Sequence, residues 1–104
     1  MGAQMTAKVL ISDKLSPTAV QILKDRGVEV DYQPDLGKEK DKLLAIIGNY
    51  DGLAIRSATK VSDKVIAAAT KLRVIGRAGI GVDNVDVPAA TARAFKPLYL
   101  FLLN

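Results

Sequence analysis

The sequence predicts a flavodoxin-like open α/β sheet in a single domain, with four or five parallel strands and helices on both faces. Short apolar runs alternate with longer helical patterns along the chain. With short connections, this order is typical of parallel strand–helix–strand units with right-handed crossovers. The strand candidates are almost entirely apolar, as strands covered on both faces must be. The 104 residues suit one domain with one modest core.

The first part of the chain predicts two strands joined by a helix. Residues 8–12 form an apolar, β-branched run between polar residues, and we expect a buried strand there. Ser16 and Pro17 open a helix, because the serine hydroxyl caps free amides and a proline in the first turn loses no needed N–H. Gly27 ends this helix, where a left-handed conformation is favoured. Residues 28–31 alternate with period two and predict the second strand.

The middle of the chain continues the same alternation. Residues 38–47 predict a second helix, which ends at Gly48. Residues 52–55 predict a third strand. Ser62 is expected to cap a third helix, whose apolar residues recur at helical spacing. Residues 73–76 predict a fourth strand.

The end of the chain differs from the rest. Asp86 and Pro88 open a short fourth helix, which is expected to end at residue 91 or 93. Residues 98–103 form an unbroken apolar run of six. We expect this run to be a fifth strand, central or at the sheet edge. The alternative is that residues 94–104 are a tail, foreign to the rest of the chain, that adheres to a neighbouring molecule.

Composition excludes several classes of function. The chain has no cysteine and no histidine, which rules out disulfides, thiolate metal sites and an imidazole base. The net charge of +4 is mild, and residues 38–42 mix both signs, so we expect a solvated helix face and not a nucleic-acid surface. No run approaches the roughly 20 apolar residues of a membrane helix. No secretory signal is visible, so we expect the cytoplasm, and residues 1–6 are expected to be a tag or a disordered start.

The loop after the third predicted strand is the first candidate site. It reads Arg-Ser-Ala-Thr-Lys over residues 56–60. Ligands bind open α/β sheets just outside the carboxyl ends of the strands. Arg56 can hold a phosphate or carboxylate with two hydrogen bonds, with the Ser57 and Thr59 hydroxyls and backbone amides beside it. The alternative is an ordinary polar loop that leads into a helix cap.

The loop after the fourth predicted strand is the second candidate, within residues 76–84. Gly79 and Gly81 begin a pattern similar to the dinucleotide fingerprint, but Asn84 stands where its third glycine would fall. We therefore expect no cofactor here. A cradle of backbone amides for an anion, next to Arg77, is favoured over the dinucleotide site. A tight turn with no ligand remains the alternative.

The two loops follow neighbouring elements of one predicted sheet, so we expect them to converge on one small anionic ligand. Asp83 and Asp86 are the only carboxylates nearby. Both precede a predicted helix, and we expect them to cap it. No nucleophile with a paired base can be identified in the sequence.

Three segments carry a resemblance to a known family. Residues 9–13, 50–61 and 67–86 are similar to the N-terminal part of the phosphoglycerate dehydrogenases, within the D-isomer-specific 2-hydroxyacid dehydrogenases, and the resemblance covers residues 7–93. It implies the flavodoxin-like substrate-binding domain of an NAD-dependent oxidoreductase. This family oxidises 3-phosphoglycerate to 3-phosphohydroxypyruvate in serine biosynthesis, with an NAD-binding domain later in the chain.

The resemblance also implies roles for individual residues. Arg56 and Ser57 match positions that hold the anionic groups of the substrate. Arg77 matches a position near the phosphate, and Ala78 and Gly79 match backbone donors to the carboxylate. The catalytic histidine, its partner glutamate and a second arginine of the family have no counterpart here. We therefore expect this chain alone to be inactive, to bind no NAD and to bind a phosphorylated 2-hydroxy acid weakly.

The resemblance breaks after Arg93, where the family continues with a strand and an Asn-Thr-Pro turn. A reading-frame change, a truncation or a redesign would each produce this break. We expect a homodimer or larger assembly through residues 94–104, and no nucleic-acid or membrane partner. The alternative function is a non-catalytic, self-associating fragment or an engineered α/β scaffold without a ligand. A response-regulator-like domain is disfavoured, because Asp13 alone does not make the acidic cluster that such a domain needs.

Overall fold

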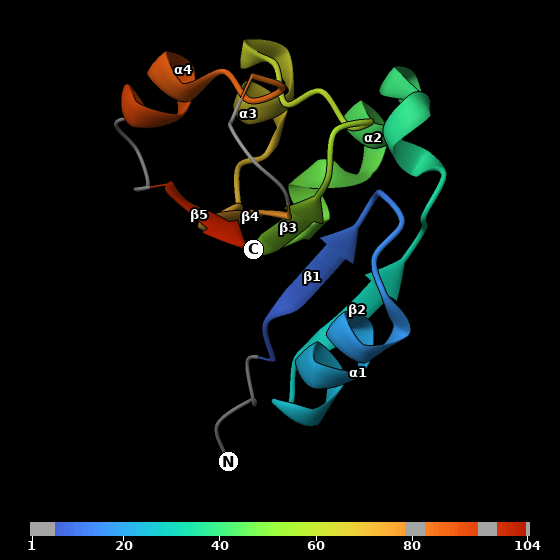
Figure 1. Ribbon diagram of the computed structural model, residues 1–104. Coiled ribbons are helices and arrows are strands. Elements are labelled where there is room, and N and C mark those ends of the chain that lie inside the picture. Colours follow the sequence, from blue (N-terminus) through green and yellow to red (C-terminus); the bar gives the residue numbers. More distant parts are fainter. Residues whose placement is uncertain (1–5, 79–82, 94–97, 104) are drawn as a thin grey trace.

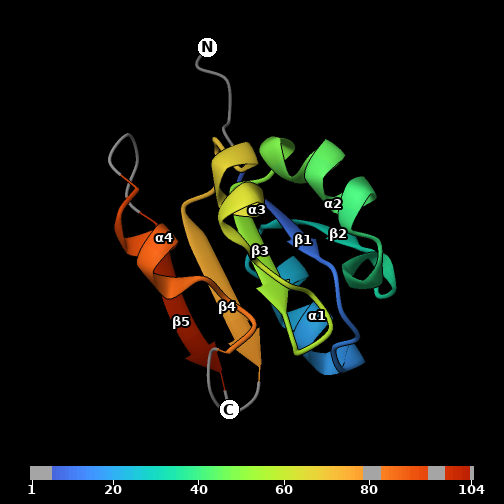
Figure 2. The ribbon, with the colours of Figure 1, turned by 90° about the horizontal axis from the view of Figure 1, so that it is seen from above.

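The computed structural model of the protein describes residues 6–78, 83–93 and 98–103 (Figure 1). Its five strands form one sheet in the order β2-β1-β3-β4-β5, and every neighbouring pair is parallel (Figure 2). This is the flavodoxin-like strand order, so the predicted fold class is confirmed. The strands are β1 (Lys8–Ile11), β2 (Glu29–Tyr32), β3 (Gly52–Ile55), β4 (Val74–Ala78) and β5 (Tyr99–Leu103).

Helices cover both faces of the sheet, but unequally. One face carries α1 (Pro17–Asp25), and the other carries α2 (Lys40–Ile46), α3 (Asp63–Ala68) and α4 (Val87–Thr91) (Figure 1). The chain steps from β1 outward to β2 and then turns back through β3, β4 and β5. Crossovers of one hand that run in opposite directions place their helices on opposite faces. In the described residues, no helix is long and apolar enough to cross a membrane.

The predicted caps of the first and third helices agree with the structure. The Ser16 hydroxyl accepts a hydrogen bond from the amide of Ala19 at 3.1 Å, at the start of α1. Ser62 caps α3 in the same way. Gly27, just after α1, has a φ of 79°, the left-handed conformation for which glycine was predicted.

The second helix differs from its predicted extent of 38–47. A short 3-10 turn (Leu36–Lys38) precedes α2, and another (Ile47–Asn49), which contains Gly48, follows it. The first turn is separate because the amide of Gly37 donates to the carbonyl of Ser12 at 2.8 Å and ties the turn to the end of β1. This long-range bond is invisible in the local pattern.

Three of the first four strands differ from their predicted bounds. The first was expected at 8–12 and ends one residue earlier, at Ile11. The second was expected at 28–31 and begins one residue later, because its register on β1 runs from Lys8↔Glu29 to Ile11↔Tyr32. The fourth was expected at 73–76 and spans 74–78. It continues further because β4 is paired with β3 and with β5.

The core is divided by the sheet. Successive residues of β3 face opposite sides, so Leu53 and Ile55 belong to the larger cluster and Ala54 to the smaller one. The larger cluster fills the space between the sheet and α2, α3 and α4. Its most completely buried members are Leu10, Leu43, Ile47, Ile55, Val61, Ala69, Leu72 and Ile75.

The apolar run near the end of the chain forms the fifth strand, as expected. β5 pairs along β4 from Val74↔Tyr99 to Ala78↔Leu103 and lies at the edge of the sheet. It is therefore part of the domain and not a detached tail. The expectation for residues 94–97 lies outside the described residues.

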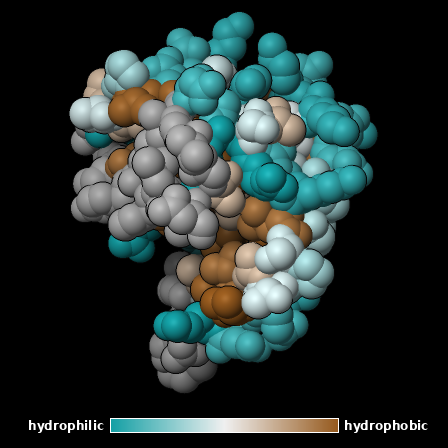
Figure 3. Space-filling view, in the orientation of Figure 1, coloured by the Kyte–Doolittle hydropathy of each residue, from teal (hydrophilic) through white to brown (hydrophobic). Residues whose placement is uncertain are grey.

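An apolar groove of about 480 Å³ remains on the α1 face. Figure 3 shows apolar side chains gathered beside α1. The groove runs from Leu15 and Ile22 beside the sheet to Ala54 of β3 and Val74 of β4. Ile22 lines the groove and is 51% exposed, so the exposed apolar surface is continuous with the groove. A single helix therefore leaves this face partly open.

Tyr50 joins β2 to the loop before β3. It is 4% exposed, and its hydroxyl donates a hydrogen bond to the carboxylate of Asp31. The Lys8 ammonium lies 5.3 Å from the centre of the tyrosine ring. Burial of the phenol, followed by its hydrogen bond to Asp31, raises the pKa of Tyr50 to about 12.

This raised pKa predicts a loss of stability at high pH. The folded state holds the Tyr50 proton more tightly than the unfolded state, whose tyrosine has a pKa of 10.0. The stabilisation is complete below pH 10 and is lost as pH rises towards 12, by up to about 1.4 kcal/mol per pH unit. In urea titrations, we expect the stability advantage of the wild type over Tyr50→Phe to shrink over this range.

Tyr32→Phe is the matched control, because Tyr32 is 40% exposed. Its stability should follow that of the wild type at each pH. Parallel pH profiles for the wild type and Tyr50→Phe up to pH 12 would contradict the prediction.

Candidate functional site

The site is built where β1, β3 and β4 end at one edge of the sheet. Ser12 and Asp13 follow β1, the Arg56 loop follows β3, and Arg77 and Ala78 are the last residues of β4. In a parallel sheet these carboxyl ends meet at one edge. The two predicted loops are therefore neighbours, as the sequence indicated.

Asp13 organises the loop after β3. Its side chain is buried, with the residue 2% exposed. One carboxylate oxygen, Oδ2, accepts hydrogen bonds from the amides of Arg56 at 2.7 Å and Thr59 at 3.1 Å. The other, Oδ1, accepts one from the Thr59 hydroxyl at 2.8 Å. The Thr59 hydroxyl also shares a hydrogen bond of 2.7 Å with the Ser12 hydroxyl. These bonds compensate the cost of burying a carboxylate.

Asn84 secures the same loop from the side of β4. Its side-chain amide donates to the carbonyls of Arg56 at 2.6 Å and Thr59 at 2.8 Å. Its side-chain oxygen accepts a hydrogen bond from Nε of Arg77. The backbone of Arg56 is thus held on both sides, through its amide by Asp13 and through its carbonyl by Asn84.

The predicted site residues divide into exposed and buried groups. Arg56 and Ser57 are exposed at the end of β3. Arg77 is 5% exposed, in register with Ile55 of β3. Ala78 is half-buried at the end of β4, and Gly79 lies outside the described residues. The structure therefore places four of the five predicted residues at the carboxyl ends of β3 and β4. Buried Arg77 donates a hydrogen bond to Asn84, and Asn84 in turn donates one to the backbone carbonyl of exposed Arg56.

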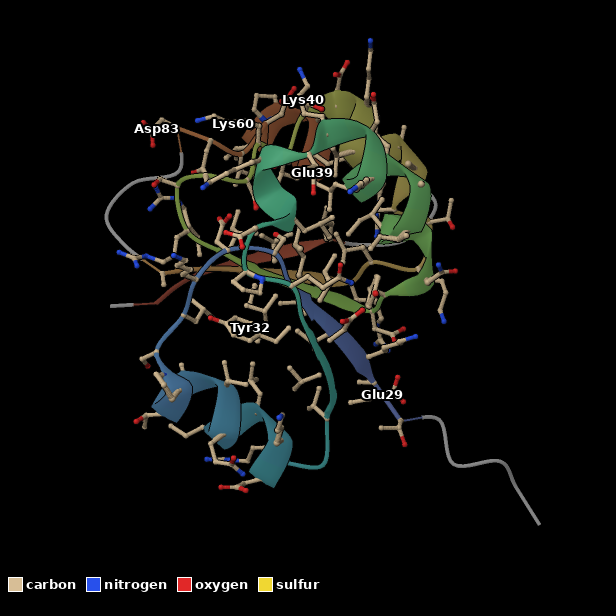
Figure 4. The ribbon with its side chains drawn as sticks, turned by 90° about the vertical axis from the view of Figure 1, so that its right-hand side faces the viewer. Glu29, Tyr32, Glu39, Lys40, Lys60 and Asp83 are labelled. Carbon is tan, nitrogen blue, oxygen red and sulfur yellow. The ribbon has the colours of Figure 1, made fainter. Side chains whose placement is uncertain are left out.

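The two expected acidic caps have different roles. Asp86 is the cap of α4, where its carboxylate accepts a hydrogen bond from the amide of Ala89 at 3.0 Å. The expectation that Asp83 also caps this helix is wrong, because α4 begins only at Val87. Asp83 lies at the surface near Lys60 (Figure 4). Its carboxylate is 3.8 Å from Nη2 of Arg77.

Sequence reasoning missed Asp13 and Asn84 as the residues that hold the site. Asp13 could have been recognised from the sequence, because a serine and an aspartate directly follow a buried strand. No local pattern identifies Asn84, because its hydrogen-bond partners are 7 to 28 residues away. Gly37 also supports the site, since a Cβ there would collide with Asp13 Oδ1 and Thr59 Oγ1.

The described residues do not fit a bound NAD. A dinucleotide site needs glycine for close helix packing and free amides at a helix N-terminus. At the matching position, Asn84 fills the space with a side chain that makes three hydrogen bonds. The helix that follows has only five residues, and a carboxylate, that of Asp86, occupies its N-terminus. In the part of the chain that the structure describes, no group of acidic residues is placed to hold a metal ion either.

Removal of the Asp13 carboxylate should release the loop after β3. Asp13→Ala leaves two amides and a hydroxyl without their acceptor, and we expect it to lower the free energy of unfolding by about 2–4 kcal/mol. Asp13→Asn should cost much less, because its oxygen can accept both amides and its NH₂ can donate to the Thr59 hydroxyl. Urea denaturation measures the difference, and amide exchange at Arg56 and Thr59 locates it. Equal stability of Asp13→Ala and the wild type would refute this role.

Comparison with known proteins identifies the family. The family model for the catalytic domain of the D-isomer specific 2-hydroxyacid dehydrogenases matches residues 9–96. D-3-phosphoglycerate dehydrogenase from Sus scrofa is 54% identical over 86 residues, which is 83% of this chain and 16% of that protein. The enzyme of the same name from Mycobacterium tuberculosis is 54% identical over 85 residues, or 82% of this chain and 16% of that protein.

Solved structures agree with the fold. A protein from Pyrococcus horikoshii matches with a TM-score of 0.84 and 28% identity, over 96% of this chain and 28% of that one. The NAD+-bound 3-phosphoglycerate dehydrogenase of Entamoeba histolytica matches with a TM-score of 0.68 and 30% identity, over 82% of this chain and 30% of that one.

The chain thus spans about one sixth of the length of the curated relatives that it matches. The family model covers most of the chain, from the second residue of β1 to beyond α4. The chain belongs to the D-isomer specific 2-hydroxyacid dehydrogenase family.

Proposed function

We propose that this chain forms the substrate-binding part of an NAD-dependent dehydrogenase that oxidises 3-phosphoglycerate to 3-phosphohydroxypyruvate in serine biosynthesis. The observation that carries the proposal is the fixed Arg56 loop, set beside the end of β4 in a chain 54% identical to phosphoglycerate dehydrogenases. The cytoplasm is the expected compartment for this metabolic role.

The arrangement of charges suits an anionic substrate. The Arg56 guanidinium is exposed, while its backbone is held by Asp13 and Asn84. A guanidinium on a fixed backbone binds a phosphate or carboxylate with less loss of conformational entropy than one on a mobile loop. Ser57 adds a hydroxyl beside it. On this proposal, the backbone amides of Ala78 and Gly79 receive the carboxylate of the substrate.

Hydride transfer is assigned to the longer protein. This chain contains no histidine, so it has no imidazole to take the hydroxyl proton of the substrate. Hydride transfer also needs a bound nicotinamide, which the described residues do not fit. We propose that the base and the NAD site belong to regions of the full-length enzyme outside these 104 residues.

Titration with 3-phosphoglycerate tests the proposed function. We expect saturable binding in the millimolar range, because an open, solvated site screens the charges. Arg56→Ala should weaken binding by about tenfold, the effect of roughly 1.4 kcal/mol for a charged hydrogen-bonded group. NMR chemical shifts measure the affinity, and no NAD reduction should accompany it.

Arg73→Ala is the matched control, because Arg73 is exposed and precedes β4, at the opposite edge of the sheet. Its affinity should equal that of the wild type. Absence of saturable binding by the wild type would instead favour the alternative of a scaffold without a ligand, and equal affinity of Arg56→Ala would remove this arginine from the site.

We also propose that the chain associates with a second copy of itself through β5 and the apolar groove on the α1 face. Two features support this proposal. β5 is an edge strand, whose outer backbone groups offer a template for pairing. The groove exposes Ile22 and reaches Val74 of β4, the strand that pairs with β5. Exposed apolar surfaces of this kind commonly mark protein contacts.

Sedimentation of the intact chain should therefore show a dimer or larger species. Ile22→Asp places a charge in the groove without removing a buried side chain, so we expect it to shift the distribution towards monomer. Thr18→Asp, on the same helix and also exposed, is the control for added charge. An intact chain that stays monomeric at every concentration tested would overturn self-association.

A further inference from the structure

A pocket of about 300 Å³ lies beside the proposed site, at the carboxyl ends of β1, β2 and β3. The chain leaves β1 in one direction to form β2 and returns on the other side to form β3, so this is the switch point of the sheet. Ligands of doubly wound sheets bind at such points. Its lining includes Asp13 and Lys14 after β1, Asp35 and Lys38 after β2, and Arg56 and Ser57 after β3.

The charges of this pocket leave a surplus of positive potential. Within the described residues, no salt bridge engages Lys14, Lys38 or Arg56. The Asp13 carboxylate is buried and already accepts three hydrogen bonds. Asp35 is the other carboxylate in the lining, and it is exposed. The pocket is therefore lined by three cationic side chains and two carboxylates. One of these carboxylates, that of Asp13, already accepts hydrogen bonds from other groups.

The walls of the pocket are held in place. The Arg56 loop is fixed by Asp13 and Asn84. The turn that carries Lys38 is tied to the end of β1 by the hydrogen bond from the Gly37 amide to the Ser12 carbonyl at 2.8 Å. A pocket with a fixed backbone loses little entropy on binding. Arg56 and Lys38 thus extend from anchored positions, and Lys14 lines the same pocket.

We propose that Lys14 and Lys38 complete, with Arg56, the part of the site that binds the phosphate group of the substrate. They would then determine specificity for phosphorylated over unphosphorylated hydroxy acids. Neighbouring strands lie about 4.8 Å apart, so a three-carbon acid can reach from the end of β4 to the Arg56 side of this pocket. The identity of the ligand rests on the proposed function, whereas the pocket and its charge do not.

The test is NMR titration of the wild type and charge variants with 3-phosphoglycerate and with glycerate, which lacks the phosphate. The double variant Lys14→Gln/Lys38→Gln should bind 3-phosphoglycerate about fivefold to twentyfold more weakly and glycerate unchanged. Asp35→Asn should bind 3-phosphoglycerate about twofold to fivefold more tightly, because it removes a repelling charge. A gain of affinity is not expected from a merely structural effect.

Lys24→Gln/Lys71→Gln is the matched control. It makes the same change in net charge, and both lysines are exposed where the chain leads into β2 and β4, at the opposite edge of the sheet. We expect its affinity for 3-phosphoglycerate to change less than twofold. If the Lys14/Lys38 variant and this control bind equally well, the inference is wrong while the proposed function stands.

Failure of the wild type to bind 3-phosphoglycerate would instead count against the proposed function. Titration with inorganic phosphate then tests the pocket by itself. Saturable shifts at the amides of Lys14, Lys38 and Ser57, lost in the double variant and kept in the control, would support a phosphate pocket. Shifts that are absent, or equal in both variants, would overturn it.

Discussion

The arrangement of the candidate site depends on the hydrogen bonds that the buried carboxylate of Asp13 accepts. A carboxylate that is 2% exposed is tolerated only when donors surround it, and here the donors come from the loop after β3. The chain must therefore wrap this loop around the end of β1. As a result, the amide of Arg56 has a fixed place, and its guanidinium is presented at the surface.

The residues of the candidate site divide into a buried group and an exposed group. Asp13 and Asn84 are buried and fix the backbone, while Arg56 and Ser57 stand in solvent on that backbone. Arg77 belongs with the support, because it is buried and donates to Asn84. A loop held in this way is preorganised, because its backbone loses little conformational entropy if a ligand binds.

The direction of the crossovers explains the remaining open surface. One crossover places α1 on one face, and three place α2, α3 and α4 on the other, where the larger core forms. The face of α1 therefore keeps an apolar groove along β3 and β4. The Arg56 loop lies at the carboxyl end of β3, whereas the groove lies on the α1 face, so the candidate site and the open apolar surface are separate parts of the molecule.

Local sequence predicts the alternation of strands and helices, the caps at Ser16 and Ser62 and the family, and it offers the fifth strand with a detached tail as the alternative. These features depend on local periodicity, on bonds across three residues and on short motifs. Tertiary contacts account for the shortening of the second helix, the support by Asp13 and Asn84, and the position of Lys14 and Lys38 beside Arg56. Asp13 and Thr59 are 46 residues apart, and no local pattern specifies a partner that only the pairing of β1 with β3 brings within hydrogen-bond distance.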